Sequence, residues 1–420
     1  MAETATARAP VAITGIGVLT SLGEGREENW RALAAGRSGI HRIGRFSVEG
    51  MRTTIGGSIE FLGIAEKETP YVTLEIARRA VREALEQSAI GAPGDFPGGL
   101  FLAAPPIEQE LSIRHAIADE TGATSYAAMM PGLAAVSAHR HLDFLNGFVA
   151  DRLQSEFGTR GMPVTVSTAC ASGASAIQLG VEAIRRGEAA AALAVGADAS
   201  IQPESVIRFN LLSALSTAND PPDQAAKPFS RNRDGFVIAE GAAALVLEDA
   251  DAAKARGAKI LGYLLGCGEA ADGFHRTRSS PDGRPILRCM LNALADAGIG
   301  PADIDYVNAH GTGTPENDKM ETLGIQAVFG ERAGEIPVSS NKSMIGHTLT
   351  AAGAVEAAFS LLTLRDQLLP PTINYREPDP AIPLDVVPNA ARAARVRRVL
   401  SNSFGFGGQN VSLVLGLEPA

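Results

Sequence analysis

The sequence predicts an α/β protein that is built from a duplicated unit. Its 420 residues include 45 glycines and only 5% aromatic residues, a composition typical of strands and helices that pack closely through tight turns. Two matches recur along the chain at nearly equal offsets. Phe236 and Phe404 each precede an apolar strand by seven residues, and Val166-Ser-Thr corresponds to Val338-Ser-Ser. Such an internal repeat predicts two α/β halves related by a pseudo-twofold axis.

The composition also narrows the class of protein. A formal charge of −10 argues against nucleic-acid binding, because phosphate contacts require clustered basic residues, and the short patch at residues 392–398 is better explained as a solvated segment. The three cysteines form no CxxC pair and are odd in number, which fits reduced thiols. No segment has the features of a secretion signal or the roughly 20 apolar residues of a membrane span. We therefore expect a cytoplasmic protein without membrane insertion.

The first quarter of the chain predicts two core strands and two helices. Gly15 and Gly17 give a weak dinucleotide-binding signal, but a third glycine and a following acidic residue are missing. A glycine turn at the end of a buried strand is therefore the better interpretation of this pair. The predicted elements are strands at residues 11–20 and 99–104 and helices at residues 26–35 and 71–87.

The segment 107–160 has no clear periodicity of its own. Helical pieces are predicted at residues 113–120 and 144–157, separated by Met129-Met-Pro-Gly. Such a segment often covers a site or a subunit contact, and methionines suit variable apolar ligands. Two methionines in a loop also serve simple packing, so both interpretations stay open.

The run Val164-Thr-Val-Ser-Thr predicts a strand that delivers Cys170 into a turn of small residues, just before a helix that ends at Gly187. A cysteine at a helix N-terminus is placed as a nucleophile, because the partial positive charge there favours the thiolate and lowers the thiol pKa. The alternative is a buried, inert cysteine, which is the commoner role of a free thiol.

Two further predicted strand ends carry ionisable side chains. His310 follows the predicted strand Ile304-Asp-Tyr-Val-Asn-Ala and begins a glycine-rich turn, and Lys342 and His347 follow Val338-Ser-Ser. The internal repeat places Lys342 opposite Cys170, so we expect these side chains to converge where open α/β sheets bind ligands. Each residue taken alone is more often structural, and a metal site is a competing interpretation. Cys170 and the two histidines lack close ligand spacing, so we expect no metal.

Five motifs stand in order along the chain. They are Thr168-Ala-Cys-Ala-Ser-Gly, Arg233-Asp-Gly-Phe-Val-Ile-Ala-Glu-Gly, Asn308-Ala-His-Gly-Thr-Gly-Thr-Pro, Asn341-Lys-Ser-Met-Ile-Gly-His and Asn402-Ser-Phe-Gly-Phe-Gly-Gly-Gln-Asn. Together they resemble the β-ketoacyl-acyl-carrier-protein synthases of the I/II type, over nearly the whole chain. The resemblance implies a homodimer with a thiolase-like fold, in which two βαβαβαββ halves form a five-layered αβαβα core. We place these halves at residues 1–258 and 259–420.

The resemblance implies an acyltransferase that elongates a fatty acyl chain by two carbons through decarboxylative Claisen condensation. Cys170 would accept the chain from acyl carrier protein, with the backbone N–H groups of Cys170 and Phe406 as the oxyanion hole. Phe406 would also gate the acyl pocket. Malonyl carrier protein would then lose CO₂, and His310 and His347 would bind the enolate, whereas a further role of His310 as a base stays open. No cofactor is implied, because the carrier protein brings the phosphopantetheine.

Other positions take supporting roles by the same resemblance. Lys342 would pair with Glu356 and orient the histidines electrostatically. Thr312 and Thr314 match positions that contact the pantetheine arm. Ile107 matches a position that limits the acyl pocket near the dimer contact.

Some residues depart from the family's pattern. Gly313 stands where serine is common, Thr350 where glycine is common, and Phe229-Ser replaces the usual Phe-Asp. Ser213 stands where the family often has a basic residue for docking acidic carrier protein, which puts the usual docking patch in doubt. These departures suggest a synthase dedicated to a specialised lipid or a polyketide-like product as the alternative function.

Two rival classes share this fold. A non-catalytic chain-length-factor subunit typically lacks the active-site cysteine, whereas this chain has Cys170. A thiolase or a type III synthase pairs cysteine and histidine with asparagine or a second cysteine where this chain has His347. Both rivals therefore fit the sequence less well.

Overall fold

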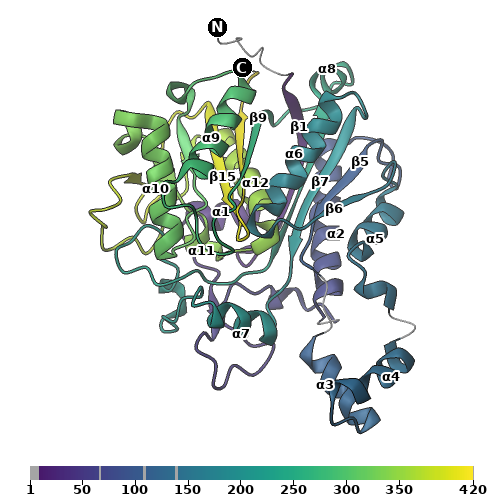
Figure 1. Ribbon diagram of the computed structural model, residues 1–420. Helices are drawn as coiled ribbons and strands as arrows, with labels where there is room; N and C mark the ends of the chain where they lie inside the picture. Colours follow the sequence, from purple (N-terminus) through teal and green to yellow (C-terminus); the bar gives the residue numbers. More distant parts are fainter. Residues whose placement is uncertain (1–8, 66–67, 107–109, 138–140, 420) are drawn as a thin grey trace.

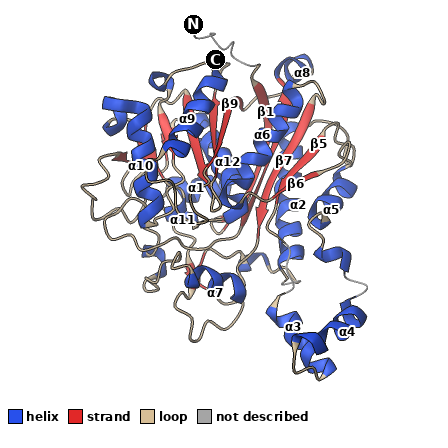
Figure 2. Cartoon of the chain, viewed as in Figure 1, coloured by secondary structure: helices blue, strands red, loops and turns tan. Residues whose placement is uncertain are grey.

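The computed structural model describes residues 9–65, 68–106, 110–137 and 141–419. One large mixed sheet runs through the molecule and has helices on its outer faces (Figure 1; Figure 2). A further helical layer lies between the two halves of the sheet and consists of α6 (Ser172–Arg185) and α12 (Ala352–Asp366), which pack against each other. The five layers αβαβα that were predicted are therefore confirmed.

The N-terminal half of the sheet has an antiparallel part and a parallel part. From the centre outward its strands are β1 (Val11–Thr20), β8 (Gly241–Asp249), β7 (Ala191–Asp198), β5 (Gly99–Ala103) and β6 (Val164–Val166). The pairs β1–β8 and β8–β7 are antiparallel, and β7–β5 and β5–β6 are parallel. Because β7, β5 and β6 are parallel, their carboxyl ends lie along the same edge of the sheet.

The C-terminal half repeats this order. Its strands are β9 (Gly262–Ala271), β16 (Gln409–Gly416), β15 (Arg398–Phe404), β10 (Tyr306–Asn308), β11 (Pro337–Ser339) and the added β13 (Asp385–Val386). The halves join where β1 pairs antiparallel with β9. Strands β6 and β11 thus hold equivalent places, as do β8 and β16, which confirms the duplication seen in the sequence.

The outer helices cover the far faces of the two half-sheets. α2 (Thr69–Ser88) packs on β1 and β8, while α9 (Arg284–Ala297) packs on β9 and β16. The helix predicted at residues 71–87 is confirmed by α2, and its apolar face is buried, with Leu74, Ala77, Ala80, Val81 and Ala84 in the core. The other helices are α1 (Arg26–Ala34), α3 (Leu111–Thr121), α4 (Tyr126–Ser137), α5 (Phe148–Phe157), α7 (Pro203–Leu211), α8 (Ala250–Ala255), α10 (Pro315–Phe329) and α11 (Lys342–Ile345).

Short elements complete the described chain. The remaining strands are β2 (Gly23–Glu24), β3 (His41–Arg42), β4 (Ile55–Gly56), β12 (Leu368–Leu369) and β14 (Arg392–Ala393). The 3₁₀ helices are η1 (Glu60–Leu62), η2 (His141–Phe144), η3 (Ala169–Ala171), η4 (Pro222–Gln224), η5 (Pro301–Asp303), η6 (Gly330–Gly334) and η7 (Leu349–Ala351).

The glycine pair near the N-terminus corrects one prediction. Gly15 and Gly17 do not form a strand-ending turn, because β1 continues through them to Thr20. A Cβ atom at these positions would stand 2.1 Å from the carbonyl oxygen of Ala84 and 1.9 Å from that of Ala80. The glycines therefore let α2 approach the strand closely, which is a packing role rather than a turn or a cofactor site.

The segment 107–160 corrects another prediction. Met129-Met-Pro-Gly does not separate two helices, because it lies inside α4, with Pro131 in the helix interior. Helices α3 and α4 pack against each other and extend below the body of the molecule (Figure 1). Ile107 lies outside the described residues, and the lid interpretation of the segment stays a prediction.

Among the described helices, none is both long and apolar enough to cross a lipid bilayer. The boundary between residues 258 and 259 stays a prediction.

Candidate active site

Cys170 lies in η3, which follows β6 and leads directly into α6, so the predicted strand-to-helix turn is confirmed. Ser172 closes this turn. Its Oγ accepts the N–H of Thr168 at 2.7 Å and donates to the carbonyl of Ala169 at 2.6 Å. The hairpin turn between β15 and β16 packs against it, since a Cβ on Gly405 would stand 2.8 Å from the carbonyl oxygen of Thr168. The backbone of the turn that carries Cys170 is therefore held by two chain segments.

The protonation state of Cys170 differs from the prediction. The residue keeps partial solvent exposure, yet the protein atoms packed around its thiol raise its pKa to about 11. The Lys342 ammonium and the backbone N–H of Phe406 act in the opposite direction and lower this pKa without overcoming burial. The predicted lowering of the pKa is therefore wrong, because desolvation outweighs the favourable field. The same N–H of Phe406 reaches the Cys170 sulfur, and its role in an oxyanion hole stays a prediction.

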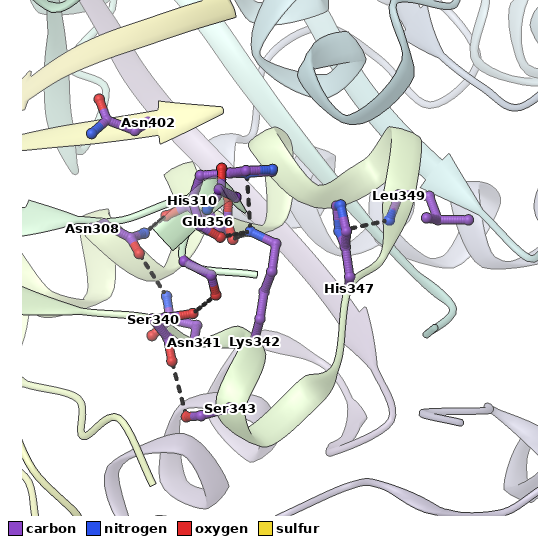
Figure 3. Close-up of polar contacts among 12 residues, drawn as sticks. Asn308, His310, Ser340, Asn341, Lys342, Ser343, His347, Leu349, Glu356 and Asn402 are labelled. Atoms are coloured by element: carbon purple, nitrogen blue, oxygen red, sulfur yellow. Dashed lines mark hydrogen bonds and ion pairs between the residues drawn. The ribbon is translucent and has the colours of Figure 1, made fainter. Parts of the chain in front are cut away.

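The C-terminal half supplies a buried polar cluster from equivalent turns. His310 follows β10, and Lys342 begins α11 after β11, in the place that Cys170 holds after β6. The Lys342 Nζ donates to the carbonyl of His310 at 2.7 Å and lies 3.3 Å from its Nδ1. It also forms an ion pair with Glu356 of α12, and both of these side chains are almost completely buried (Figure 3). The predicted pair is thus present.

The two imidazoles are neutral and aim their Nε2–H groups at one place. Burial, reinforced by the Lys342 charge, holds the pKa of His310 and of His347 well below the usual value. The Nδ1 of His347 accepts the backbone N–H of Leu349 at 3.2 Å, so its proton is on Nε2, a buried atom without a partner among the described residues. Lys342 likewise occupies the Nδ1 of His310. Two neutral N–H donors suit a developing oxyanion.

Cys170 and the two histidines converge as predicted. Their sulfur and ring nitrogen atoms all lie within 4.8 Å of one another, and the two imidazole rings meet edge to face with centroids 5.3 Å apart. This spacing resembles a metal site, but the Lys342 ammonium beside His310 opposes a dication, and both Nδ1 atoms already accept hydrogen bonds. The cluster is better suited to an anionic intermediate, and the absence of a metal stays a prediction.

Several residues that hold the cluster were missed by the sequence reasoning. Glu321 accepts the backbone N–H groups of His310 at 2.9 Å and Gly311 at 2.8 Å, and it also accepts from Asn402 at 3.1 Å. Burial raises the pKa of Glu321 to about 7, against the effect of these three donors. Its spacing from Asp318 by three residues places both carboxylates on one side of α10, a signal that the sequence did contain.

Asp318 holds the adjoining loop in the same way. It accepts the N–H of Phe229 at 2.7 Å and that of Gly313 at 3.1 Å, and the Nε atom of Arg233 lies 3.7 Å away. This contact explains why the motif that begins at Arg233 belongs to the site, since it braces the turn that follows His310.

A narrow cavity of about 60 Å³ reaches the cluster from the surface and is lined by Thr312, Thr314 and Phe406. Contact of the two threonines with the pantetheine arm stays a prediction. The hydroxyls of the two threonines lie 2.9 Å apart, and Thr314 also caps α10 by accepting the N–H of Asn317 at 3.2 Å. The structure thus brings together every predicted site residue that it describes, leaving only Ile107 unplaced.

The comparisons with known proteins agree with this site. The chain matches the beta-ketoacyl synthase N-terminal domain over residues 8–253 and the beta-ketoacyl synthase C-terminal domain over residues 261–376. The chain belongs to the β-ketoacyl synthase family and is an acyltransferase-class condensing enzyme.

Individual relatives cover nearly the whole chain. It is 36% identical to the 3-oxoacyl-[acyl-carrier-protein] synthase 2 of Coxiella burnetii, over 96% of this chain and 98% of that protein. It is 38% identical to the tetracenomycin polyketide synthase ketoacyl synthase alpha subunit of Streptomyces glaucescens, over 96% of each. A solved β-ketoacyl synthase from Burkholderia phymatum is similar with a TM-score of 0.84 and 33% identity, over 98% of this chain and 100% of that one.

A second solved structure holds a type II polyketide synthase acyl-carrier protein in complex with its ketosynthase bound to the hexaketide. It is similar with a TM-score of 0.85 and 32% identity, over 98% of this chain and 100% of that chain. The thiolase-like fold of these condensing enzymes is therefore the fold of this chain.

Proposed function

We propose that this protein is a 3-oxoacyl-[acyl-carrier-protein] synthase, which joins an acyl chain to a malonyl unit and lengthens the chain by two carbons. The observation that carries this function is the convergence of a cysteine sulfur with two neutral imidazoles, within 4.8 Å, at the end of a narrow cavity. Such a site offers a nucleophile and two N–H donors for an enolate oxygen, the requirements of a decarboxylative condensation.

The first step is acyl transfer. The Cys170 sulfur attacks the carbonyl carbon of a carrier-bound thioester, and the pantetheine sulfur leaves and takes up the proton that the thiol gives up. The backbone N–H of Phe406, which already reaches the sulfur, stabilises the tetrahedral oxyanion together with the N–H of Cys170. The raised pKa disfavours a free thiolate at Cys170 before the substrate is bound.

The second step forms the new carbon–carbon bond. The malonyl thioester loses CO₂, and its enolate oxygen accepts the Nε2–H groups of His310 and His347. The enolate carbon then attacks the acyl group on Cys170, the cysteine sulfur leaves and takes up a proton from solvent, and a 3-oxoacyl thioester remains on the carrier. Lys342 and Glu356 contact neither reacting carbon and act as positioning residues, because they fix the tautomer and orientation of His310.

The partner in both steps is an acyl carrier protein, loaded with either the acyl or the malonyl group. The narrow cavity is lined by the exposed Arg276 and Arg278, whose positive charge suits a phosphopantetheine phosphate on an acidic carrier. Ser213 is exposed beyond the end of α7, so the usual basic docking position is indeed neutral here. The reaction requires no other cofactor.

We further propose a cytoplasmic homodimer. Strand β6, which precedes Cys170, lies at one end of the sheet and presents an edge, and Val164 on that strand is 39% exposed. Nearby Met162 is 89% exposed. An apolar edge strand of this kind is a liability unless a second chain covers it.

The function is tested by incubating the protein with acyl carrier protein that bears a hexanoyl group and then adding malonyl carrier protein. We expect intact-mass analysis to show a hexanoyl adduct on Cys170, followed by a 3-oxooctanoyl product on the carrier. A protein that shows neither an adduct on Cys170 nor a condensation product, with any carrier-bound acyl chain supplied, contradicts the proposal. A chain-length-factor subunit gives this negative result.

A further inference from the structure

Cys170 lines a second, wider cavity of about 640 Å³, and the turn that follows His347 reaches its wall through Leu349 and Thr350. Leu349 has a φ of 47°, in the left-handed region that residues with a side chain seldom adopt. Such a backbone conformation is strained and persists only where the surrounding structure enforces it. The strain therefore indicates that specific contacts hold this turn beside the site.

The strained residue is also the one that fixes the tautomer of His347. The Leu349 N–H donates to the His347 Nδ1 at 3.2 Å, which leaves the ring proton on Nε2. A backbone N–H makes this bond only while the peptide group between residues 348 and 349 keeps its orientation. The conformation of the turn thus decides whether the Nε2 of His347 can donate a hydrogen bond.

Backbone pairing holds the first end of the turn. The N–H of His347 donates to the carbonyl of Val237 at 2.7 Å, and the carbonyl of His347 accepts the N–H of Ala239 at 2.9 Å. This pairing places His347 itself, but it does not fix the peptide group that carries the Leu349 N–H. A second anchor is needed on the far side of Leu349.

Asp198, at the end of β7, supplies this second anchor. Its Oδ2 accepts both the N–H of Thr350 at 3.1 Å and the hydroxyl of Thr350 at 2.7 Å, while its Oδ1 accepts the N–H of Ser200 at 3.0 Å. The Asp198 side chain is completely buried, and η7 packs directly on β7. Two bonds to one carboxylate oxygen fix the backbone and the side chain of Thr350, so the turn is held on both sides of the strained residue.

The Thr350 hydroxyl is turned onto β7. Although Thr350 lines the wider cavity, its Oγ1 donates to Asp198 and also lies 3.3 Å from the carbonyl oxygen of Ala197. A hydroxyl group has a single proton, and here that proton is already donated within the protein. The hydroxyl therefore serves the turn and not a ligand in the cavity.

We propose that Thr350, anchored by Asp198, is a positioning residue for His347. It holds the Leu349 N–H on the His347 Nδ1, so that the Nε2 proton stays available to the enolate oxygen. This inference rests on the proposed function, because only decarboxylation and condensation use that proton. Without the anchor the turn can relax and withdraw the Leu349 N–H. The imidazole can then carry its proton on Nδ1, and its Nε2 becomes an acceptor that repels an enolate.

The test separates the step that uses His347 from the step that does not, in a Thr350→Val variant that keeps the shape of the side chain and removes its hydroxyl. Release of CO₂ from malonyl carrier protein is measured in the Cys170→Gln background, where no acyl transfer competes. Transfer of a hexanoyl group to Cys170 is measured by intact mass in the single variant. We expect decarboxylation to fall about tenfold, the effect of one lost hydrogen bond, and acyl transfer to stay nearly unchanged. Thr350→Ser keeps the hydroxyl and should restore decarboxylation.

Thr363 provides a matched control. It is buried on α12, and its Oγ1 has no hydrogen-bond partner among the described residues. Thr363→Val makes the same chemical change and should leave both rates as they are. Asp198 is a less selective position for the test, because its charge also raises the pKa of the Cys170 thiol, so Asp198→Asn would alter both steps.

The outcomes separate this inference from the proposed function. A selective loss of decarboxylation in Thr350→Val that Thr350→Ser restores supports the inference. Unchanged decarboxylation, a selective loss of acyl transfer, or an equal loss of both steps in Thr350→Val overturns the inference while the synthase function stands. A wild-type protein that forms neither an acyl adduct on Cys170 nor a condensation product overturns the proposed function itself, and the inference with it.

Discussion

The turn after β6 and the turn after β11 hold equivalent places in the two halves, yet they deliver opposite kinds of side chain. The first presents Cys170, which is partly exposed, has a raised pKa and lines both cavities. The second presents Lys342, whose side chain is 2% exposed and is held by Glu356 and His310. The N-terminal half thus supplies the nucleophile, and the C-terminal half, called the positioning half below, supplies Lys342 and the two histidines that it holds in place. Each half can be tested separately.

The largest effect is expected from the reacting half. Cys170→Gln should lower condensation by more than about 10⁴-fold, because the acyl acceptor is lost, as for other covalent nucleophiles. Decarboxylation of malonyl carrier protein should persist, since the histidines are untouched. Both rates are followed by mass analysis of the carrier. Cys267→Ala, a change at a buried cysteine of β9, is the control and should leave condensation intact.

The next effect concerns the donors that the positioning half supplies. His347→Ala removes one buried Nε2–H, so condensation and malonyl decarboxylation should both fall by about 10²- to 10³-fold, the usual cost of one oxyanion donor. Transfer of the acyl group to Cys170 should be affected much less. His115→Ala on the exposed surface of α3 serves as the matched control. A variant that decarboxylates malonyl carrier protein at the wild-type rate would show that His347 is not a donor.

A third effect concerns how much the buried ion pair of the positioning half contributes to the stability of the fold. Glu356→Gln leaves the Lys342 ammonium buried without its counter-ion, so the free energy of unfolding should fall by about 3–5 kcal/mol. Urea unfolding followed by circular dichroism gives this value. The exposed pair between Arg186 and Glu188, with side chains 52% and 57% exposed, is the comparison. Breaking it with Arg186→Ala should change stability little. Equal losses of stability in the two variants would contradict the larger contribution expected of the buried pair.

The smallest effect is a pH dependence. Burial raises the pKa of Glu321 to about 7 from 4.5, so the folded state binds a proton between these values that the unfolded state has released. The contribution of this carboxyl group to stability is therefore full below pH 4.5 and is lost as pH rises through 7. Glu321→Gln is expected to be less stable than wild type, because glutamine keeps only one acceptor oxygen and one of the two backbone N–H groups loses its partner, but the deficit should shrink between pH 5 and pH 8. A deficit that grows with pH would show that folding lowers the pKa of Glu321 instead of raising it.

The same comparison shows what the sequence could predict. Cys170, His310, Lys342 and His347 were predicted to converge because each follows a core strand, and the strand order of a duplicated fold fixes where those strands end. The pairing of Lys342 with Glu356 followed from the family resemblance. These predictions needed only the local pattern and the order of the elements.

The features that were missed depend on contacts between distant segments. Gly15 and Gly17 were read as a turn because nothing in the local pattern shows that α2 packs onto them. Proline removes a helical hydrogen bond and therefore predicts a break at Pro131, although α4 continues through this residue. The pKa of Cys170 was predicted from its place at a helix start, whereas the packed atoms around it, which come from several elements, decide the outcome.

The central layer of helices has a consequence for the order in which the protein can fold. α6, which carries the nucleophile turn at its start, is covered by α12, and these helices are separated by more than 160 residues of chain. During synthesis the N-terminal half leaves the ribosome with the apolar side of α6 uncovered until α12 has been made. A ribosome that stalls between the two helices would thus hold an incomplete chain with an exposed apolar surface, and we expect chaperones to bind it at this stage.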